Sequence, residues 1–339
     1  MRRWQHLVLV CLILATAGLA VPRRSAHADG PASPYGDDRF GVTLNGDPQQ
    51  LLTLGVRWFI TYDSSSAAAA LPPGAVLVQY VPLGSAEPPA ANLTVQVEAA
   101  PGSYWLLGNE PNVTGSAGEL TGAAYARAFH DATVTIKQAD PTAMIVAPNL
   151  LNFDFTCTAC PGYTSGHAWL DSFLAAYAAD YGGLPPVDVW AIHTYPLDFN
   201  NFPQANASLV EDQLQEFRTY LDAVPGLTGA PIWDTELGTH WGYEGLQWRN
   251  DSSGVTKAYP TGAFRTDLLL GYMQQVIGWL QANGPALQIN RWFLFASHVA
   301  TPEPWETVYG GIDLLDGDGP NAQLTPFGQL YRQLAGLSP

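Results

Sequence analysis

Eight short apolar segments, separated by helix-like segments, constrain the fold of this chain more than any other feature. Most of the eight are apolar on both faces, which is typical of parallel strands that are covered by crossover helices. The count of eight predicts a closed (β/α)8 TIM barrel, an α/β fold built as a single domain. The strand-like segments are residues 40–44, 56–62, 75–81, 104–109, 144–148, 187–194, 231–236 and 289–296.

Helical patterns fill most of the intervals between these segments, with apolar residues at i, i+3 and i+4 in the longer ones. An open doubly wound sheet is the alternative fold, but it should have a glycine-rich phosphate loop after its first strand. The chain has Asn45-Gly46-Asp47-Pro48 at that place, so the barrel is favoured. The expected helices are 48–54, 91–98, 121–139, 166–181, 208–223, 266–282 and 326–334, whereas 64–73 shows no clear helix.

The N-terminal end has the pattern of a secretory signal peptide. Arg2 and Arg3 precede a mostly apolar run over 7–21, and the small-x-small sequence at 26–28 predicts cleavage after it. An uncleaved anchor helix is the alternative, but this run is shorter than the ~20 residues that span a bilayer. We therefore expect a secreted protein with a signal peptide at 1–28, a flexible leader at 29–39 and a barrel domain at 40–337.

The predicted mature chain is strongly acidic. The full chain has 14 Lys and Arg and 30 Asp and Glu. Removal of the signal peptide would remove four of the basic residues, so the mature chain would have ten basic and 30 acidic residues. Such a surface disfavours nucleic acid or an anionic membrane as the partner and is compatible with a neutral substrate. Aromatic residues make up 12% of the sequence, a content that both sugar-binding clefts and ordinary cores use.

Two cysteines remain after removal of the signal, Cys157 and Cys160 in the sequence Cys-Thr-Ala-Cys. In an exported protein this spacing predicts a small disulfide that closes a loop. A zinc site would need a second Cys or His pair at suitable spacing, and a thioredoxin-like pair would need a helix that starts at the motif. The sequence has neither pattern, so no metal is expected there.

Polar side chains gather where the predicted strands end. The fourth strand ends in Asn-Glu-Pro at 109–111, the sixth in His193 and Tyr195, and the seventh in Glu236. The carboxyl ends of the strands form the active-site face of a TIM barrel, so two glutamates would meet across its mouth. Side chains alternate along a strand, which predicts that Asp234 and Glu236 share one face and that His193 and Tyr195 share another.

Paired glutamates at this face favour glycoside hydrolysis with retention of configuration. That reaction needs two carboxyl groups ~5–5.5 Å apart, one as nucleophile and one as acid/base. The nucleophile must be ionised, whereas adjacent negative charge and partial burial keep its partner protonated. We expect the Asn109 amide to hold a sugar hydroxyl, and Tyr195 or His193 to donate a hydrogen bond to the nucleophile.

Several motifs give the chain a resemblance to the glycoside hydrolases of clan A. Asn-Glu-Pro at the end of the fourth strand and the glutamate at the end of the seventh are the strongest of them. The resemblance spans residues 40–335 and implies Glu110 as the acid/base, Glu236 as the nucleophile and Arg57 as a support for the nucleophile. The chain is similar to the Asl1-like glucanases and to the enzymes of families 5 and 39, and its motifs do not separate these families. The supporting matches are Gly55-Val-Arg-Trp58, His193-Thr-Tyr195 and Leu324-Thr-Pro-Phe-Gly328.

Other candidate sugar-binding residues lie near the predicted mouth. Trp241, Tyr243 and Trp248 follow the seventh strand, where their rings could stack on sugars or pack within the loop. His298 could bind sugar or cap a loop. Many clan A members carry a tryptophan on the eighth strand, and Trp292 is the candidate here, although it stands at the start of that strand.

Together these patterns predict a secreted, retaining β-glycoside hydrolase that acts on a neutral poly- or oligosaccharide. We expect a monomer that needs no cofactor, binds carbohydrate and has no membrane contact once the signal is removed. A non-catalytic carbohydrate-binding barrel for adhesion or sensing is the first alternative, but such a protein usually lacks one of the two acids. A metal-dependent hydrolase or deacetylase is the second. It would need a His/Asp cluster at strand ends, and the first and fifth strands have no His-x-His pair.

Overall fold

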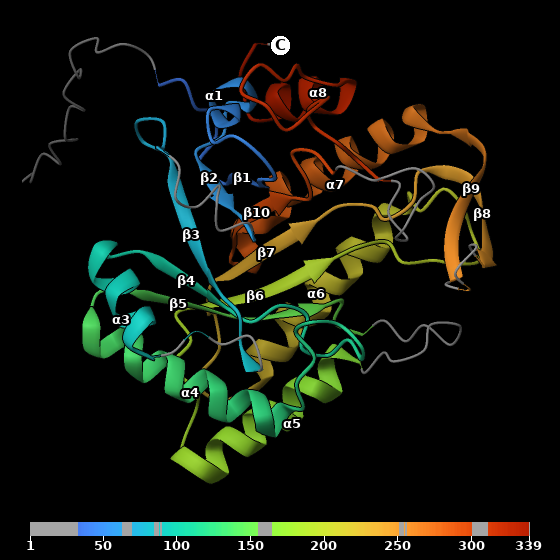
Figure 1. Cartoon of the computed structure of the whole chain (residues 1–339). Helices are drawn as coiled ribbons and strands as arrows, with labels where there is room; N and C mark the ends of the chain where they lie inside the picture. Colours follow the sequence, from blue (N-terminus) through green and yellow to red (C-terminus); the bar gives the residue numbers. More distant parts are fainter. Residues whose placement is uncertain are drawn as a thin grey trace, which may run out of the picture. The chain divides into compact units, whose positions relative to one another are not determined.

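The core of the molecule is a closed barrel of eight parallel strands (Figure 1). The computed structural model describes residues 33–62, 70–84, 88, 90–154, 165–250, 254, 256–299 and 311–338, and the barrel lies within the compact unit Pro34–Pro339. The predicted (β/α)8 fold is confirmed. In order around the barrel the strands are β1 (Phe40–Thr43), β2 (Trp58–Ile60), β3 (Val76–Val81), β4 (Tyr104–Leu107), β5 (Met144–Leu151), β6 (Val189–Thr194), β7 (Ile232–Leu237) and β10 (Ile289–Leu294), which pairs with β1.

Helices lie between the strands at the predicted positions. The last helix, Pro326–Leu334, shows why the sequence Thr325-Pro-Phe-Gly328 is needed at its start. Thr325 caps this helix by accepting a hydrogen bond from the Gly328 N–H at 3.2 Å. Pro326 occupies the first turn, where no backbone donor is required. A Cβ at Gly328 would come 2.1 Å from the carbonyl oxygen of Leu314, so only glycine fits. Within the described residues the helices are α1 (Gln50–Leu54), α3 (Ala90–Ala99), α4 (Gly122–Ala139), α5 (Gly166–Tyr181), α6 (Ala207–Ala223), α7 (Thr266–Leu287) and α8 (Pro326–Leu334).

Apolar side chains pack on both sides of the strands. The outer core lies between the strands and the helices and contains most of the buried apolar residues. The inner core fills the barrel, so the barrel is a packed structure and not a pore. The buried members of the inner core are Trp58, Ile60, Val78, Leu106, Val146, Val189, Ala191, Trp233 and Phe293.

An arginine and two tryptophans close the end of the barrel at which the strands begin. The guanidinium of Arg291 lies 3.5 Å from the ring centroid of Trp58 and 4.9 Å from that of Trp233. Burial lowers the pKa of Arg291 to about 10, while the negative charge of Asp38 raises it. Asp38 accepts a hydrogen bond from Arg291 at 3.2 Å, which keeps this largely buried cation paired.

Arg57 lies at the same end of the barrel. It directly precedes β2, and its side chain forms an ion pair with Asp38, which precedes β1. The beginnings of parallel strands lie at the opposite end of a barrel from their carboxyl ends, where Glu236 is found. The expectation that Arg57 supports Glu236 is therefore wrong.

Trp292 faces the helices and not the mouth. Its side chain is completely buried in the outer core, and its ring contacts Phe40 edge-on at a centroid distance of 5.0 Å. The guanidinium of Arg39 lies 5.3 Å from the same ring. Trp292 therefore cannot contact a sugar at the mouth, and the assignment as a substrate-binding residue is corrected: the strand places it on the outer face.

An antiparallel hairpin follows β7, where the sequence indicated only a long loop. Its strands, β8 (Tyr243–Asn250) and β9 (Thr256–Phe264), form a separate two-stranded sheet beside the barrel (Figure 1). The base of the hairpin is held by the edge-on contact of Tyr243 with Phe264, at 5.1 Å between centroids. The alternation of apolar residues was weak here because both faces of the hairpin are largely exposed.

Some of the sequence predictions lie outside the described residues. These are the signal peptide at 1–28, the first four residues of the leader at 29–39, and the disulfide between Cys157 and Cys160. They stay predictions, as does the monomeric state. Among the described residues, no helix combines the length and the apolar character that a membrane crossing requires.

Candidate active site

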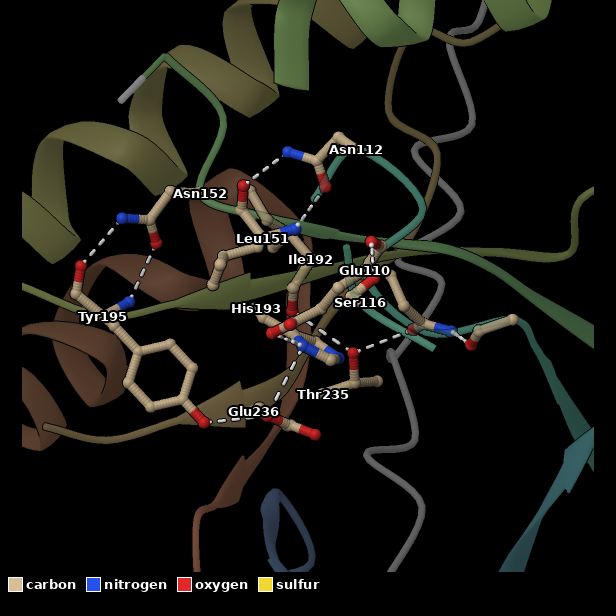
Figure 2. Close-up of polar contacts among 12 residues, drawn as sticks. Glu110, Asn112, Ser116, Leu151, Asn152, Ile192, His193, Tyr195, Thr235 and Glu236 are labelled. Carbon is tan, nitrogen blue, oxygen red and sulfur yellow. Dashed lines mark hydrogen bonds and ion pairs between the residues drawn. The ribbon is translucent and has the colours of Figure 1, made fainter. Parts of the chain in front are cut away.

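Glu110, His193 and Glu236 meet at the mouth of the barrel (Figure 2). They come from the ends of β4, β6 and β7. Nδ1 of His193 lies 3.1 Å from Oε1 of Glu110 and 3.4 Å from Oε2 of Glu236. An oxygen of each glutamate and a nitrogen of the histidine all lie within 4.8 Å of one another. The side chain of Glu110 is 19% exposed, whereas those of His193 and Glu236 are buried, so Glu110 is the more accessible acid.

Two tyrosine hydroxyls hold the carboxylate of Glu236. Tyr62, just beyond β2, donates to Oε1 at 2.6 Å, and Tyr195, just beyond β6, donates to Oε2 at 2.7 Å. The ring of His240 packs edge-on against Tyr195 at a centroid distance of 4.5 Å. The expected donation from Tyr195 is thus present in the geometry. Tyr62 was missed, although its place at the end of a strand could have identified it.

A bulge in β7 turns Glu236 into the mouth. Ile192 pairs with Asp234 and the next residue of β6, His193, pairs with Glu236, so Thr235 is an extra residue in β7. Strict alternation would have put Asp234 and Glu236 on one face. Instead Asp234 pairs in register with Ile192 and Trp292, which belong to the outer core, so it faces the helices and the prediction of a shared face is wrong. There it accepts a hydrogen bond from Thr194.

The backbone of Glu110 has an unusual conformation that is fixed by its neighbours. Its φ is +46°, in the left-handed region that non-glycine residues rarely adopt. Its N–H donates to the carbonyl of Asn149 at 3.0 Å. A Cβ at Gly118 would come 1.7 Å from the carbonyl oxygen of Asn109, so the following loop can close over this segment only with glycine there. Asn109 is partly exposed, and its Oδ1 has no hydrogen-bond partner among the described residues.

Two buried asparagines tie the strand ends together (Figure 2). Asn112 donates to the Leu151 carbonyl at 2.8 Å and accepts from the Leu151 N–H at 3.0 Å. Asn152 makes the same pair of bonds to Tyr195, both at 2.9 Å. Each amide replaces a ladder contact that the diverging backbones no longer make. Sequence inspection missed them because a buried asparagine has no periodic signal.

A third asparagine links three strands beneath the glutamates. Asn149 has a φ of +60° and lies at the register shift between β5 and β6. Its amide donates to the Gly108 carbonyl at 2.9 Å, and its Oδ1 accepts from the Thr235 hydroxyl at 2.9 Å. The backbones that carry Glu110 and Glu236 are thereby connected through one side chain.

The electrostatics of the cluster favour bound protons. Burial raises the pKa of Glu236 and the negative charge of Glu110 adds to this, while His193 and the hydroxyls of Tyr62 and Tyr195 act in the opposite direction. Burial alone would lower the pKa of His193, but the charges of Glu236 and Glu110 outweigh it and raise the pKa. Glu236 and His193 therefore bind protons more tightly than they would in water.

The remaining predicted sugar-binding residues differ in their accessibility. Trp241 is completely buried and donates from Nε1 to the Gly245 carbonyl at 3.0 Å, so it fixes the hairpin and offers no ring face to a sugar. That assignment is corrected. Trp248 is half exposed, on β8. His298 is partly exposed near the end of β10, with Nδ1 3.6 Å from Oδ2 of Asp313, and both of its interpretations stay open.

Glu110, His193 and Glu236 are also close enough to serve as three metal ligands. However, both oxygens of Glu236 already accept short hydrogen bonds from tyrosine hydroxyls. A cation on Glu236 would have to displace at least one of these donors or share its oxygen. The tyrosine hydroxyls therefore already hold the carboxylate of Glu236 in place by hydrogen bonds. Chemically, the arrangement offers one buried, oriented carboxylate and one accessible carboxyl group within 4.8 Å of it.

Comparison with known proteins identifies the barrel type. The family model described as "Glycosyl hydrolase catalytic core" matches residues 46–331. An endo-β-1,3-glucanase of glycoside hydrolase family 128, subgroup II, from Pseudomonas viridiflava is 22% identical, with a TM-score of 0.60 over 87% of this chain and 97% of that one. A subgroup I endo-β-1,3-glucanase from Amycolatopsis mediterranei, in complex with laminaritriose, is 21% identical, with a TM-score of 0.54 over 88% and 99%. The search of the curated proteins gave no match.

Proposed function

Because the chain belongs to the glycosyl hydrolase catalytic core family and is a glycoside hydrolase, we propose that it hydrolyses β-glycosidic bonds with retention of configuration. The observation that carries this proposal is the pairing of Glu110 with Glu236 at the barrel mouth, with oxygens within 4.8 Å. Retaining enzymes hold their carboxyl groups ~5–5.5 Å apart, whereas inverting enzymes leave ~6.5–9.5 Å for a water molecule. The short separation supports attack by a carboxylate.

In the first step Glu236 attacks the anomeric carbon. Its two tyrosine bonds and its burial fix the orientation of the carboxylate, which suits it to act as the nucleophile. Glu110 is the more exposed acid and donates its proton to the oxygen of the leaving sugar. The glycosidic C–O bond breaks as the ester between Glu236 and the sugar forms.

In the second step water replaces Glu236. Glu110, now ionised, removes a proton from the water molecule as its oxygen attacks the anomeric carbon. The ester bond breaks, and its electron pair returns to the carboxylate of Glu236. His193 contacts both glutamates and changes its hydrogen bonding as the negative charge moves from one to the other. Asn109, which is partly exposed beside Glu110, is the residue that we propose to hold a sugar hydroxyl through its side-chain amide.

A neutral β-1,3-glucan is the substrate that we propose for the first test. The similar solved structures from Pseudomonas viridiflava and Amycolatopsis mediterranei are described as endo-β-1,3-glucanases. The excess of 30 Asp and Glu over 14 Lys and Arg disfavours an anionic polysaccharide. We further propose secretion, on the pattern of the first 28 residues, and action on extracellular glucan.

The test is hydrolysis of laminarioligosaccharides, with the anomer of the first product followed by proton NMR. Retention predicts that the β-anomer appears first and then mutarotates. Glu236→Gly should lose activity. With azide and an activated aryl β-glucoside it should form the α-glycosyl azide, because a single displacement inverts the configuration of the β-glucoside. Initial release of the α-anomer by the wild-type protein would contradict the mechanism. Binding without release of sugar would favour the non-catalytic carbohydrate-binding barrel. Activity that disappears in chelator would favour the metal-dependent hydrolase.

A further inference from the structure

We infer that Oε1 of Glu236 is the oxygen that attacks the sugar, and that Tyr62 is the residue that positions it. This inference rests on the proposed retaining mechanism. It adds a positioning residue just beyond β2, whereas Arg57, the residue expected to give this support, lies just before that strand. The two oxygens of Glu236 have different surroundings, and this difference carries the inference.

Oε2 has one hydrogen-bond donor and one ion-pair neighbour. It accepts a hydrogen bond from Tyr195 at 2.7 Å, and Nδ1 of His193 lies 3.4 Å away. Among the described residues, Oε1 has one hydrogen-bond partner, the hydroxyl of Tyr62 at 2.6 Å. A carboxylate oxygen has about two lone pairs. Oε2 is therefore stabilised by a hydrogen bond and by the nearby imidazole, whereas Oε1 is stabilised by one neutral hydroxyl and is the oxygen freer to form a bond to carbon.

Tyr62 is well suited to hold an oxygen that must gain and lose a covalent bond. Its ring is fixed by an edge-on contact with Tyr80 at a centroid distance of 4.8 Å. Burial and the negative charge of Glu236 raise the pKa of Tyr62 well above its usual value, so the hydroxyl stays a neutral donor. A neutral donor orients the carboxylate and stabilises its charge less than an arginine would, which leaves the carboxylate more nucleophilic.

The two chemical steps depend on Tyr62 in different ways. In the first step Oε1 loses negative charge as it bonds to the anomeric carbon, so its hydrogen bond weakens. In the second step the bond between carbon and Oε1 breaks, the electron pair returns to Oε1, and the hydroxyl of Tyr62 stabilises the returning charge. The oxygen of water forms the new bond to carbon, and its proton goes to Glu110. Loss of the hydroxyl should therefore slow the second step more than the first.

The test compares Tyr62→Phe with Tyr80→Phe. Both changes keep the paired rings, and the hydroxyl of Tyr80 has no hydrogen bond to Glu236 among the described residues. Burst kinetics with a dinitrophenyl β-glucoside separate the two steps. Titration of carbon-13-labelled glutamate by NMR, with Glu236→Gln for assignment, follows the carboxyl group directly.

For Tyr62→Phe we expect a larger burst, a steady-state kcat about tenfold lower with a lower KM, and a Glu236 titration moved about one pH unit higher. Tyr80→Phe should change none of these. An unmoved titration in folded Tyr62→Phe overturns the inference, and so does a titration that moves without growth of the burst. Failure of the proposed function can be distinguished from failure of this inference. In the former case the wild-type protein would release no product with retained configuration, whatever the titration shows.

Discussion

Nδ1 of His193 lies 3.1 Å from Oε1 of Glu110 and 3.4 Å from Oε2 of Glu236, so one imidazole nitrogen faces both carboxyl groups. Without this contact two carboxylates at such a distance would repel each other in a buried site. The charges of Glu236 and Glu110 raise the pKa of His193 against the effect of burial. His193 is thus the group through which the protonation of one glutamate affects the other.

Substitution of His193 should separate the donor function from the charge. His193→Asn keeps a donor near the position of Nδ1 but cannot become positively charged, whereas His193→Leu lacks both properties. Because the positive charge lowers the pKa of Glu236, its loss should move the acid limb of kcat/KM to higher pH in both variants. We expect kcat to fall about tenfold in the first variant and about a hundredfold in the second. Equal profiles for wild type and His193→Asn would show that the charge is unimportant.

Asp234→Asn should stabilise the protein and leave activity intact. Asp234 is completely buried, one of its oxygens has no partner among the described residues, and burial raises its pKa well above the usual value. A carboxyl group whose pKa is raised on folding costs stability once the pH exceeds its unfolded value. We therefore expect the free energy of unfolding at pH 7 to rise by ~1 kcal/mol or more. In urea titrations the gain should vanish as the pH falls through the ordinary aspartate range near ~4.

The activity of this variant also tests where the aspartate lies. Asp234 accepts from Thr194 on the outer face of the barrel, so kcat/KM should stay within about twofold of the wild-type value. A large loss of kcat, with stability increased, would mean that Asp234 acts in catalysis. Thr194→Val is the matched control, because it removes the donor from the same pair.

The repeating pattern of the barrel could be predicted from the sequence because it depends on period and composition. Strands apolar on both faces are recognisable at any position, and the eight segments lie within a few residues of the observed strands. The pairing of Glu110 with Glu236 was equally accessible, because strand ends in a barrel converge on one face. Parallel topology turns distant residues into neighbours.

The local details that aim these side chains had no such pattern. The extra residue Thr235 reverses the direction of Glu236 relative to Asp234, and only the paired register reveals it. Tryptophan was misleading for a physical reason. Trp241 and Trp292 are large apolar residues that gain more free energy from complete burial than from exposure at a cleft, and both are buried. Aromatic content therefore could not indicate which rings are available to a sugar.

Asn152→Ala should impair activity through Tyr195. The amide of Asn152 satisfies both the N–H and the carbonyl of Tyr195, at 2.9 Å each, in a buried position. Leaving two buried backbone groups unpaired costs ~2–5 kcal/mol. We expect that loss in urea unfolding, together with a fall in kcat as the Tyr195 hydroxyl moves from Glu236. Asn206→Ala is the control, since it removes only the cap of α6 and should cost ~1 kcal/mol without a change in kcat.

Arg57→Gln should leave catalysis unchanged. The side chain of Arg57 is 37% exposed and pairs with Asp38 at the end of the barrel opposite to Glu236. An exposed ion pair of this kind is screened by solvent and contributes ~0.5 kcal/mol or less. The acid limb of kcat/KM should therefore coincide with that of the wild-type protein, because no positive charge near Glu236 is lost. Arg291→Gln provides the contrast: it removes a buried cation from the faces of Trp58 and Trp233 and should lower stability by ~2 kcal/mol, still without moving the acid limb. If Arg57→Gln alone moved that limb to higher pH, Arg57 would have to reach Glu236 in the working enzyme, and the placement of the two residues at opposite ends of the barrel would be wrong.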